Sequence, residues 1–324
     1  MSESIKNYPI SIQEMFRAEK IVYQFIKPTQ LINYKSLSEL IGADIYIKHE
    51  NHNPGGSFKI RGGINIMHHL NQAGVKGVIT FSTGNHGISV ARAAKWFNIE
   101  AVIVVPKGNN PAKNKLIMDA GATLVEDGSN FEEAARAVER LTKEKNLHYI
   151  HAANEPHLIN GVGTEFIEIV KDLPNIDTII LPIGAGSEVA AAITVFKNIN
   201  PKIEVIAVQA ECSKAAYVSW KNKSIQSSEN KTFAGGFATG TAYSIPFDIY
   251  KEELTDFVTL SEEEIKEGMI LSLKHTRNLA EGAGAAPIMA AFKLKKQLEG
   301  KKVVLQMSGC NTDLSILKEI VGRL

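Results

Sequence analysis

Lys59 stands in a run of residues that suits a reactive amine better than a solvated surface charge. It follows an aromatic residue and a flexible glycine pair within residues 54–62, which read PGGSFKIRG, shortly after the strand-like stretch 44–48. A partly buried lysine amine frees its lone pair and becomes a nucleophile toward carbonyl groups, which is how proteins hold an aldehyde as a Schiff base. The sequence therefore predicts that Lys59 binds an aldehyde covalently.

A glycine-rich turn at residues 184–187 has the pattern of an anion site. Residues 178–183 read as a buried strand and residues 189–196 as a helix, so the turn joins a strand to a helix start. Small residues let backbone N–H groups approach an anion, and the helix dipole favours negative charge there. Pyridoxal phosphate combines an aldehyde with a phosphate, so this turn and Lys59 together indicate that cofactor. A plain connecting turn is the alternative, because glycine turns are common between strands and helices.

Residues 82–87, which read STGNHG, form a second polar turn. It lies between the strand-like stretch 77–81 and the amphipathic stretch 88–97. Hydroxyl, amide and imidazole groups at a helix N-terminus, with its free N–H groups, suit a carboxylate. We expect this turn to bind the carboxylate of an amino acid. The same residues also suit a simple capped helix start with Ser82 or Thr83 as the N-cap, and the two interpretations are compatible.

Near the C-terminus, the strand-like stretch 302–307 leads into residues 308–311, which read SGCN. In open α/β sheets, ligands bind at the carboxyl ends of the strands. We therefore expect the small hydroxyl of Ser308 to contact the cofactor ring.

The elements that must position these turns alternate along the chain. Strands are expected near residues 77–81, 101–105 and 122–125, with helical stretches between them. Such alternation predicts parallel sheets covered by helices on both faces. Ser261, followed by three glutamates, predicts a capped helix start.

These motifs occur in one order, together with residues 281–285, which read EGAGA. From about Val22 to its end, the chain resembles the fold type II pyridoxal phosphate enzymes, and within them the threonine/serine dehydratases and serine racemases. The resemblance implies an α/β fold like that of the tryptophan synthase β subunit, with two domains that each hold a mostly parallel twisted sheet flanked by helices. Residues 1–50 and 155–324 would form the large cofactor-binding domain, and residues 51–154 the small domain.

The resemblance also implies roles for individual residues. Lys59 matches the Schiff-base lysine, and Thr83 stands where the family places the serine that serves racemases as a second acid/base group. Cofactor binding is implied for Phe58, Lys59, Asn85, Gly184, Ala185, Gly186, Ser187, Gly236, Glu281 and Ser308. Substrate binding is implied for Ser82, Thr83, Gly84, Asn85 and His86.

The implied activity is an ammonia-lyase that converts L-threonine, L-serine or both to a 2-oxo acid and ammonia by β-elimination. A neutral hydroxyl such as that of Ser308 does not keep the pyridine nitrogen protonated, so the ring is a weaker electron sink and prompt loss of a β-leaving group is favoured. The alternatives are a serine racemase, a lyase for another β-substituted amino acid, and, from another class, a non-catalytic amino-acid sensor. No metal site is expected, because Gln209 and Ala215 match the carboxylates with which some relatives bind a divalent cation.

Composition limits the remaining possibilities. A chain of 324 residues with 44% apolar content suits two domains, and its formal charge of +1 gives no basic field for nucleic acid. Two cysteines do not suggest a disulfide framework, and no apolar run is long enough to span a bilayer. Residues 1–6 lack a secretory pattern, so a cytoplasmic enzyme is expected. A homodimer is implied by the resemblance alone.

Overall fold

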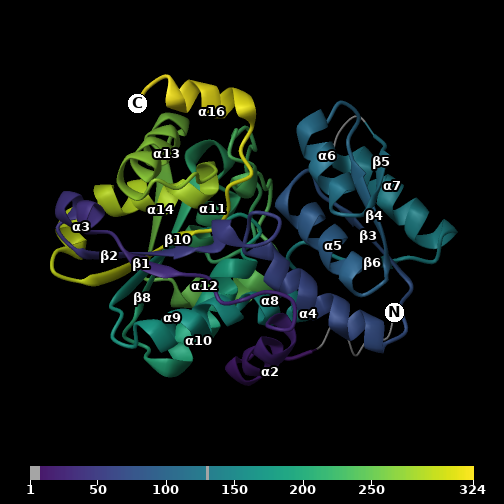
Figure 1. The fold of residues 1–324 in the computed structure, drawn as a ribbon, viewed down its shortest axis with the longest axis horizontal. Helices are drawn as coiled ribbons and strands as arrows, with labels where there is room; N and C mark the ends of the chain where they lie inside the picture. The colour runs from purple at the N-terminus through teal and green to yellow at the C-terminus, as the bar shows by residue number, and fades with distance from the viewer. Residues whose placement is uncertain (1–7, 129–130) are drawn as a thin grey trace. The chain divides into compact units, whose positions relative to one another are not determined.

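The computed structural model of the protein describes residues 8–128 and 131–324 (Figure 1). Contacts within the chain group it into two compact units. The first unit holds residues 8–26 and Lys59–Val162, and the second holds Lys27–Phe58 and Gly163–Leu324. The domain boundaries expected above stay a prediction. Each unit is built around one sheet, which confirms the expected α/β fold class.

The sheet of the first unit has four parallel strands in the order β5-β4-β3-β6. Three of them confirm the strands expected from the sequence. The strands are β3 (Gly77–Phe81), β4 (Glu100–Val105), β5 (Thr123–Glu126) and β6 (His148–Tyr149).

Helices cover both faces of this sheet, with α5 and α6 on one side and α7 on the other (Figure 1). Alternate residues of a strand point to opposite faces, so β4 sends Ile103 into one core with Ile88 and sends Val102 into the other with Val138. The helices of this unit are α2 (Ile12–Val22), α4 (Lys59–Gln72), α5 (Asn85–Trp96), α6 (Pro111–Asp119), α7 (Phe131–Glu144) and α8 (Pro156–Val162).

The sheet of the second unit has six strands in the order β1-β2-β10-β7-β8-β9. All neighbouring pairs are parallel except β1 with β2. The parallel strands therefore end at one common edge, where ligand sites of open α/β sheets form. The strands are β1 (Leu31–Asn33), β2 (Asp44–His49), β7 (Thr178–Pro182), β8 (Glu204–Ala210), β9 (Asp256–Leu260) and β10 (Lys302–Met307).

Helices α13 and α14 cover one face of this sheet, and α9 and α10 cover the other (Figure 1). The capped start expected at Ser261 is confirmed, because its hydroxyl accepts the Glu264 N–H at 3.2 Å and its own N–H donates to the Glu264 carboxylate at 2.8 Å. The helices of this unit are α3 (Lys35–Ile41), α9 (Thr164–Asp172), α10 (Ser187–Ile199), α11 (Ala215–Asn222), α12 (Ser244–Glu253), α13 (Glu262–Thr276), α14 (Gly282–Lys293), α15 (Lys295–Leu298) and α16 (Leu314–Val321), with short 3-10 turns η1 (Glu50–His52), η2 (Glu211–Ser213) and η3 (Gly235–Phe237). None of the helices within the described ranges is long and apolar enough to cross a membrane.

A buried ion pair joins β2 to α9 behind the loop that leads to Lys59. Lys48 and Glu168 contact each other and have exposed fractions of only 0% and 4%. Lys48 also donates to the Thr29 carbonyl at 2.9 Å, and the Thr29 N–H donates to Glu168 at 3.1 Å. The Thr29 hydroxyl donates in turn to Glu50 at 2.5 Å, at the start of that loop. A buried charge is tolerated only when it is paired in this way.

We expect Lys48→Met to lower the free energy of unfolding by about 3–5 kcal/mol, because it leaves the Glu168 carboxylate buried without its cation. Urea unfolding followed by circular dichroism measures the change. The control is Lys35→Met, which removes an exposed pair of 3.9 Å with Glu39 and should change stability by less than about 0.5 kcal/mol. Equal stability of Lys48→Met and the wild type would contradict the importance of the pair.

Candidate active site

The residues before Lys59 are fastened to the segment that follows β10. The Phe58 N–H donates to the Ser308 carbonyl at 3.0 Å, and the Cys310 N–H donates to the Gly56 carbonyl at 2.9 Å. The Asn311 amide adds a hydrogen bond of 2.7 Å to the Gly55 carbonyl. We call this set of contacts the loop clasp. Because Lys59 follows Phe58 directly, the loop clasp restricts the position of the Lys59 backbone.

Glu281 lies beside the same segment. It is the N-cap residue of α14, is 8% exposed, and its N–H donates to the Gly309 carbonyl at 2.9 Å. Its carboxylate oxygen Oε1 lies 2.8 Å from the position that a Cβ atom on Gly309 would take, and 3.7 Å from the position of a Cβ atom on Gly236. Glu281 therefore connects the end of β10 to the turn around Gly236.

The glycine turn between β7 and α10 is built by two different constraints. A Cβ atom on Gly184 would overlap the carbonyl oxygen of Gly236, so a close backbone approach requires glycine there. Gly186 has a φ of +93°, in the left-handed region that favours glycine. The helix that begins at Ser187 runs for 13 residues, and its first N–H groups have no carbonyl partner within the helix. The turn thus has the form of an anion site.

Hydrogen bonds hold the loop that carries Gly236. Glu262 accepts the Phe233 N–H and the Thr232 hydroxyl, both at 2.8 Å. The hydroxyl of Ser213, which lies in η2 just after β8, donates to the Phe237 carbonyl at 2.9 Å. The loop is therefore anchored by α13 on one side and by the 3-10 turn η2 on the other.

In the first unit, residues 82–84 lead into α5, and Asn85 and His86 are the first two residues of that helix. The Ser89 hydroxyl donates to the Lys59 carbonyl at 2.6 Å, which joins α4 to α5. His86 is buried, and its Nε2 lies 3.1 Å from the Thr80 hydroxyl, which donates to the Ile150 carbonyl at 2.8 Å. Burial lowers the pKa of His86 to about 3, and the positive charges of Lys59 and His151 add to the effect. The imidazole is therefore neutral near pH 7.

The helix cap expected in this turn is corrected by one or two residues. Gly84, and not Ser82 or Thr83, is the N-cap of α5. The Ser82 hydroxyl still accepts a helix N–H, that of Gly87 at 2.9 Å, and also the Gly84 N–H at 3.3 Å. Because Ser82 reaches the first turn from outside the helix, the N-cap position needs no side chain of its own.

The structure thus brings the expected site residues together in two groups. In the second unit, contacts run without a break from Phe58 through Ser308, Glu281 and Gly236 to Gly184, all at the carboxyl edge of the sheet. In the first unit, the Lys59 carbonyl is hydrogen-bonded to Ser89 of α5 and the Lys59 charge acts on His86, while Thr83 is exposed.

Sequence reasoning missed the residues that hold these groups in place. Asn311 was present in a recognised motif, but its contact with Gly55 spans most of the chain and has no local signal. Glu262 carried only the signal of a helix start, and Tyr250, which packs against Gly186, carried none.

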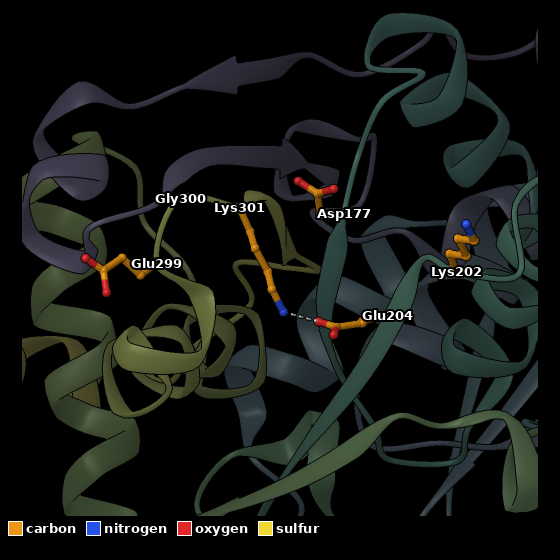
Figure 2. A pocket seen from close by; sticks show the side chains of 6 residues that line it. All are labelled: Asp177, Lys202, Glu204, Glu299, Gly300 and Lys301. Atoms are coloured by element: carbon orange, nitrogen blue, oxygen red, sulfur yellow. Dashed lines mark hydrogen bonds and ion pairs between the residues drawn. The ribbon is translucent and has the colours of Figure 1, made fainter.

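A separate cavity of about 370 Å³ opens at the amino ends of β7, β8 and β10 (Figure 2). Figure 2 shows Lys301 reaching toward Glu204, and the two form an ion pair of 2.8 Å. Partial burial raises the pKa of Glu204, but hydrogen bonds from Lys301 and Thr178 outweigh it, so the pKa lies below its ordinary value. The cavity contains none of the expected site residues and lies at the opposite edge of the sheet from them. Its lining residues are Asp177, Lys202, Glu204, Glu299, Gly300 and Lys301.

Gln209, which stands where some relatives have a metal-binding carboxylate, is a buried amide. Gln209 is fully buried at the end of β8, and its Oε1 accepts the Tyr217 N–H at 3.1 Å. In the part of the chain that the structure describes, no group of three or more His, Cys, Asp or Glu side chains is placed to hold a metal ion.

The depressed pKa of His86 predicts a loss of stability in acid. An unfolded histidine has a pKa near 6.5 and binds a proton below it, whereas folded His86 does not bind one until about pH 3. Stability that is present above about pH 6.5 is therefore lost progressively as the pH falls toward 3, and we expect this residue to account for a loss of about 1 kcal/mol between about pH 7 and pH 5.5. Urea unfolding at both pH values should show a smaller loss for His86→Gln than for the wild type. An unchanged loss in His86→Gln would contradict the assignment.

Comparisons with known proteins agree with this geometry. A family model described as "Pyridoxal-phosphate dependent enzyme" matches residues 22–309. The L-threonine ammonia-lyase of Thermotoga maritima is 33% identical over 316 residues, which cover 97% of this chain and 79% of that protein. The L-threonine dehydratase catabolic TdcB of Staphylococcus aureus is 34% identical over 318 residues, which cover 96% of this chain and 92% of that protein. The solved structure of maize serine racemase is similar with a TM-score of 0.91 and 26% identity, over 98% of both chains. The chain therefore belongs to the pyridoxal-phosphate dependent enzymes, and its fold is that of fold type II.

Proposed function

We propose that this protein is an ammonia-lyase that converts L-threonine, L-serine or both to ammonia and a 2-oxo acid. The observation that carries the proposal is the loop clasp, in which the Phe58 N–H binds the Ser308 carbonyl at 3.0 Å. The clasp joins the residue before Lys59 to Ser308, a residue with a neutral hydroxyl that directly follows the central strand β10. Two relatives at 33% and 34% identity, named above, act on L-threonine by their names.

We assign the cofactor phosphate to Gly184, Ala185, Gly186 and Ser187. The backbone of this turn fits a phosphate, because glycine at 184 and 186 gives the turn its tight path and the first N–H groups of α10 have no carbonyl partner within the helix. Pyridoxal phosphate supplies an electron sink that stabilises negative charge at the substrate Cα.

We propose cofactor contacts for five further residues. Ser308, which is 4% exposed, would bind the pyridine nitrogen as a neutral donor, and Phe58, which is 7% exposed, would pack near the ring. Gly236 and Glu281 would border the ring, because Glu281 Oε1 lies between Gly236 and the end of β10. Asn85, the first residue of α5, would bind the phenolic oxygen.

The substrate carboxylate would bind at the turn of residues 82–86. Its hydroxyl, amide and N–H groups lie at a helix N-terminus, where negative charge is favoured. His86 is neutral near pH 7, so it can serve as a hydrogen-bonding partner and adds no formal charge. In this arrangement the Lys59 Nζ takes the proton from the substrate Cα as general base.

A second candidate activity is racemisation of serine. The similarity to maize serine racemase favours it, and Thr83 offers an exposed hydroxyl that could move a proton on the face opposite Lys59. Threonine is stiffer at χ1 than serine, so we rank racemisation below elimination. We also propose, on the family resemblance, that the enzyme is a cytoplasmic homodimer.

The test is incubation of the holoenzyme with L-threonine, L-serine and D-serine. We expect L-threonine, L-serine or both to give ammonia and 2-oxo acid in equal amounts, faster than any interconversion of L- and D-serine. Lys59→Ala should lower the rate about 10³-fold or more, because it removes both the covalent anchor and the base. Ammonia, 2-oxo acid and serine enantiomers are measured separately.

Lys76→Ala, which changes an exposed lysine of the same unit, should retain the wild-type rate. Faster formation of D-serine than of pyruvate from L-serine would reverse the ranking of the two activities. Full activity of Lys59→Ala would refute the site.

A further inference from the structure

The hydroxyl of Tyr250 is buried, and none of the described residues gives it a hydrogen bond. Tyr250 lies on α12 and is 1% exposed, and within residues 8–128 and 131–324 its hydroxyl has no hydrogen-bond partner. Burial raises the pKa of Tyr250, so the group keeps its proton and is available as a donor. A buried hydroxyl without a partner is costly, and native structures rarely leave one without a ligand, an ion or an ordered water.

The ring of Tyr250 lies against the glycine turn at residues 184–187. Its Cε1 atom is 3.5 Å from the point where a side chain of Gly186 would begin, and Pro246 of the same helix is closer still at 2.8 Å. Cε1 is bonded to the carbon that carries the hydroxyl, so the hydroxyl oxygen lies two bonds away from the ring atom that contacts the turn. Phe247 packs edge-on against the ring, with centroids 5.5 Å apart, and limits its movement.

We propose that the Tyr250 hydroxyl donates a hydrogen bond to the cofactor phosphate. The inference rests on the proposed binding of the phosphate at Gly184–Ser187 and adds a side-chain donor to that set of backbone donors. A phosphate is the ligand that suits this place, because the helix N-terminus attracts an anion and a protonated phenol donates to it without adding charge. The unpaired hydroxyl then has its partner in the ligand.

The test compares Tyr250→Phe with the wild type, which differ by one oxygen atom. The full-length chain, freed of cofactor by dialysis, is titrated with pyridoxal phosphate and, separately, with pyridoxal, which lacks the phosphate. We expect Tyr250→Phe to bind pyridoxal phosphate about tenfold more weakly and pyridoxal equally well, because only the phosphate loses a donor. The phosphorus resonance of the bound cofactor should also shift in the ³¹P NMR spectrum.

If the Tyr250 hydroxyl had only a structural role, its removal would lower the melting temperature of the cofactor-free protein, and our proposal predicts otherwise. The cofactor-free variant should melt at the wild-type temperature or above it, because the substitution removes an unsatisfied buried group. The control is Tyr46→Phe, whose hydroxyl binds Asp44 at 3.1 Å at the start of β2 and which should leave both affinities unchanged. Equal affinity of Tyr250→Phe and the wild type for pyridoxal phosphate, or an equal loss for both ligands, would overturn the inference. Absence of cofactor binding in the wild type would instead refute the proposed function.

Discussion

The loop clasp is the interaction on which the candidate site depends. β10 lies between β2 and β7, and parallel pairing on both sides fixes its register in the sheet. The segment after β10 therefore has little freedom, and backbone hydrogen bonds from Phe58 and Cys310 pass that restriction to the loop before Lys59. Because these bonds join main-chain atoms, they depend on the path of the backbone more than on side-chain identity. Lys59 begins α4, and the residue before it is hydrogen-bonded to the segment that follows a central strand.

Paired polar groups provide the second support for this region. Lys48, Glu168 and Glu50 are all buried below or beside the start of the lysine loop, and each has a charged or hydrogen-bonding partner. Such networks contribute little net stability compared with apolar packing, but they penalise any arrangement that separates the partners. Glu262 acts in the same way on the loop of Gly236, since it accepts two hydrogen bonds from neighbouring residues of that loop. These paired groups therefore disfavour other conformations of the two loops.

Two of the groups that we propose for the site are neutral. His86 is neutral near pH 7 because of its burial, and Ser308, which we propose to contact the ring nitrogen, has a neutral hydroxyl. Neutral donors and helix N-termini can bind anionic phosphate and carboxylate groups without the desolvation cost of buried cations. This arrangement is consistent with a cofactor that serves as a moderate electron sink, and it suits elimination better than reactions that need a strongly stabilised carbanion.

The sequence by itself determined the local features. The strands around residues 77–81 and 302–307, the capping box at Ser261 and the strand–turn–helix pattern around Gly186 follow from period, cap chemistry and the conformational freedom of glycine, all of which act over a few residues. The order of the motifs was enough to indicate the family. Only the tertiary structure decided that Gly236 approaches Gly184, that Asn311 holds Gly55, and that a tyrosine from α12 reaches the turn before α10. These contacts join residues far apart in the chain, and they arise from strand order and helix packing, which local periodicity does not specify.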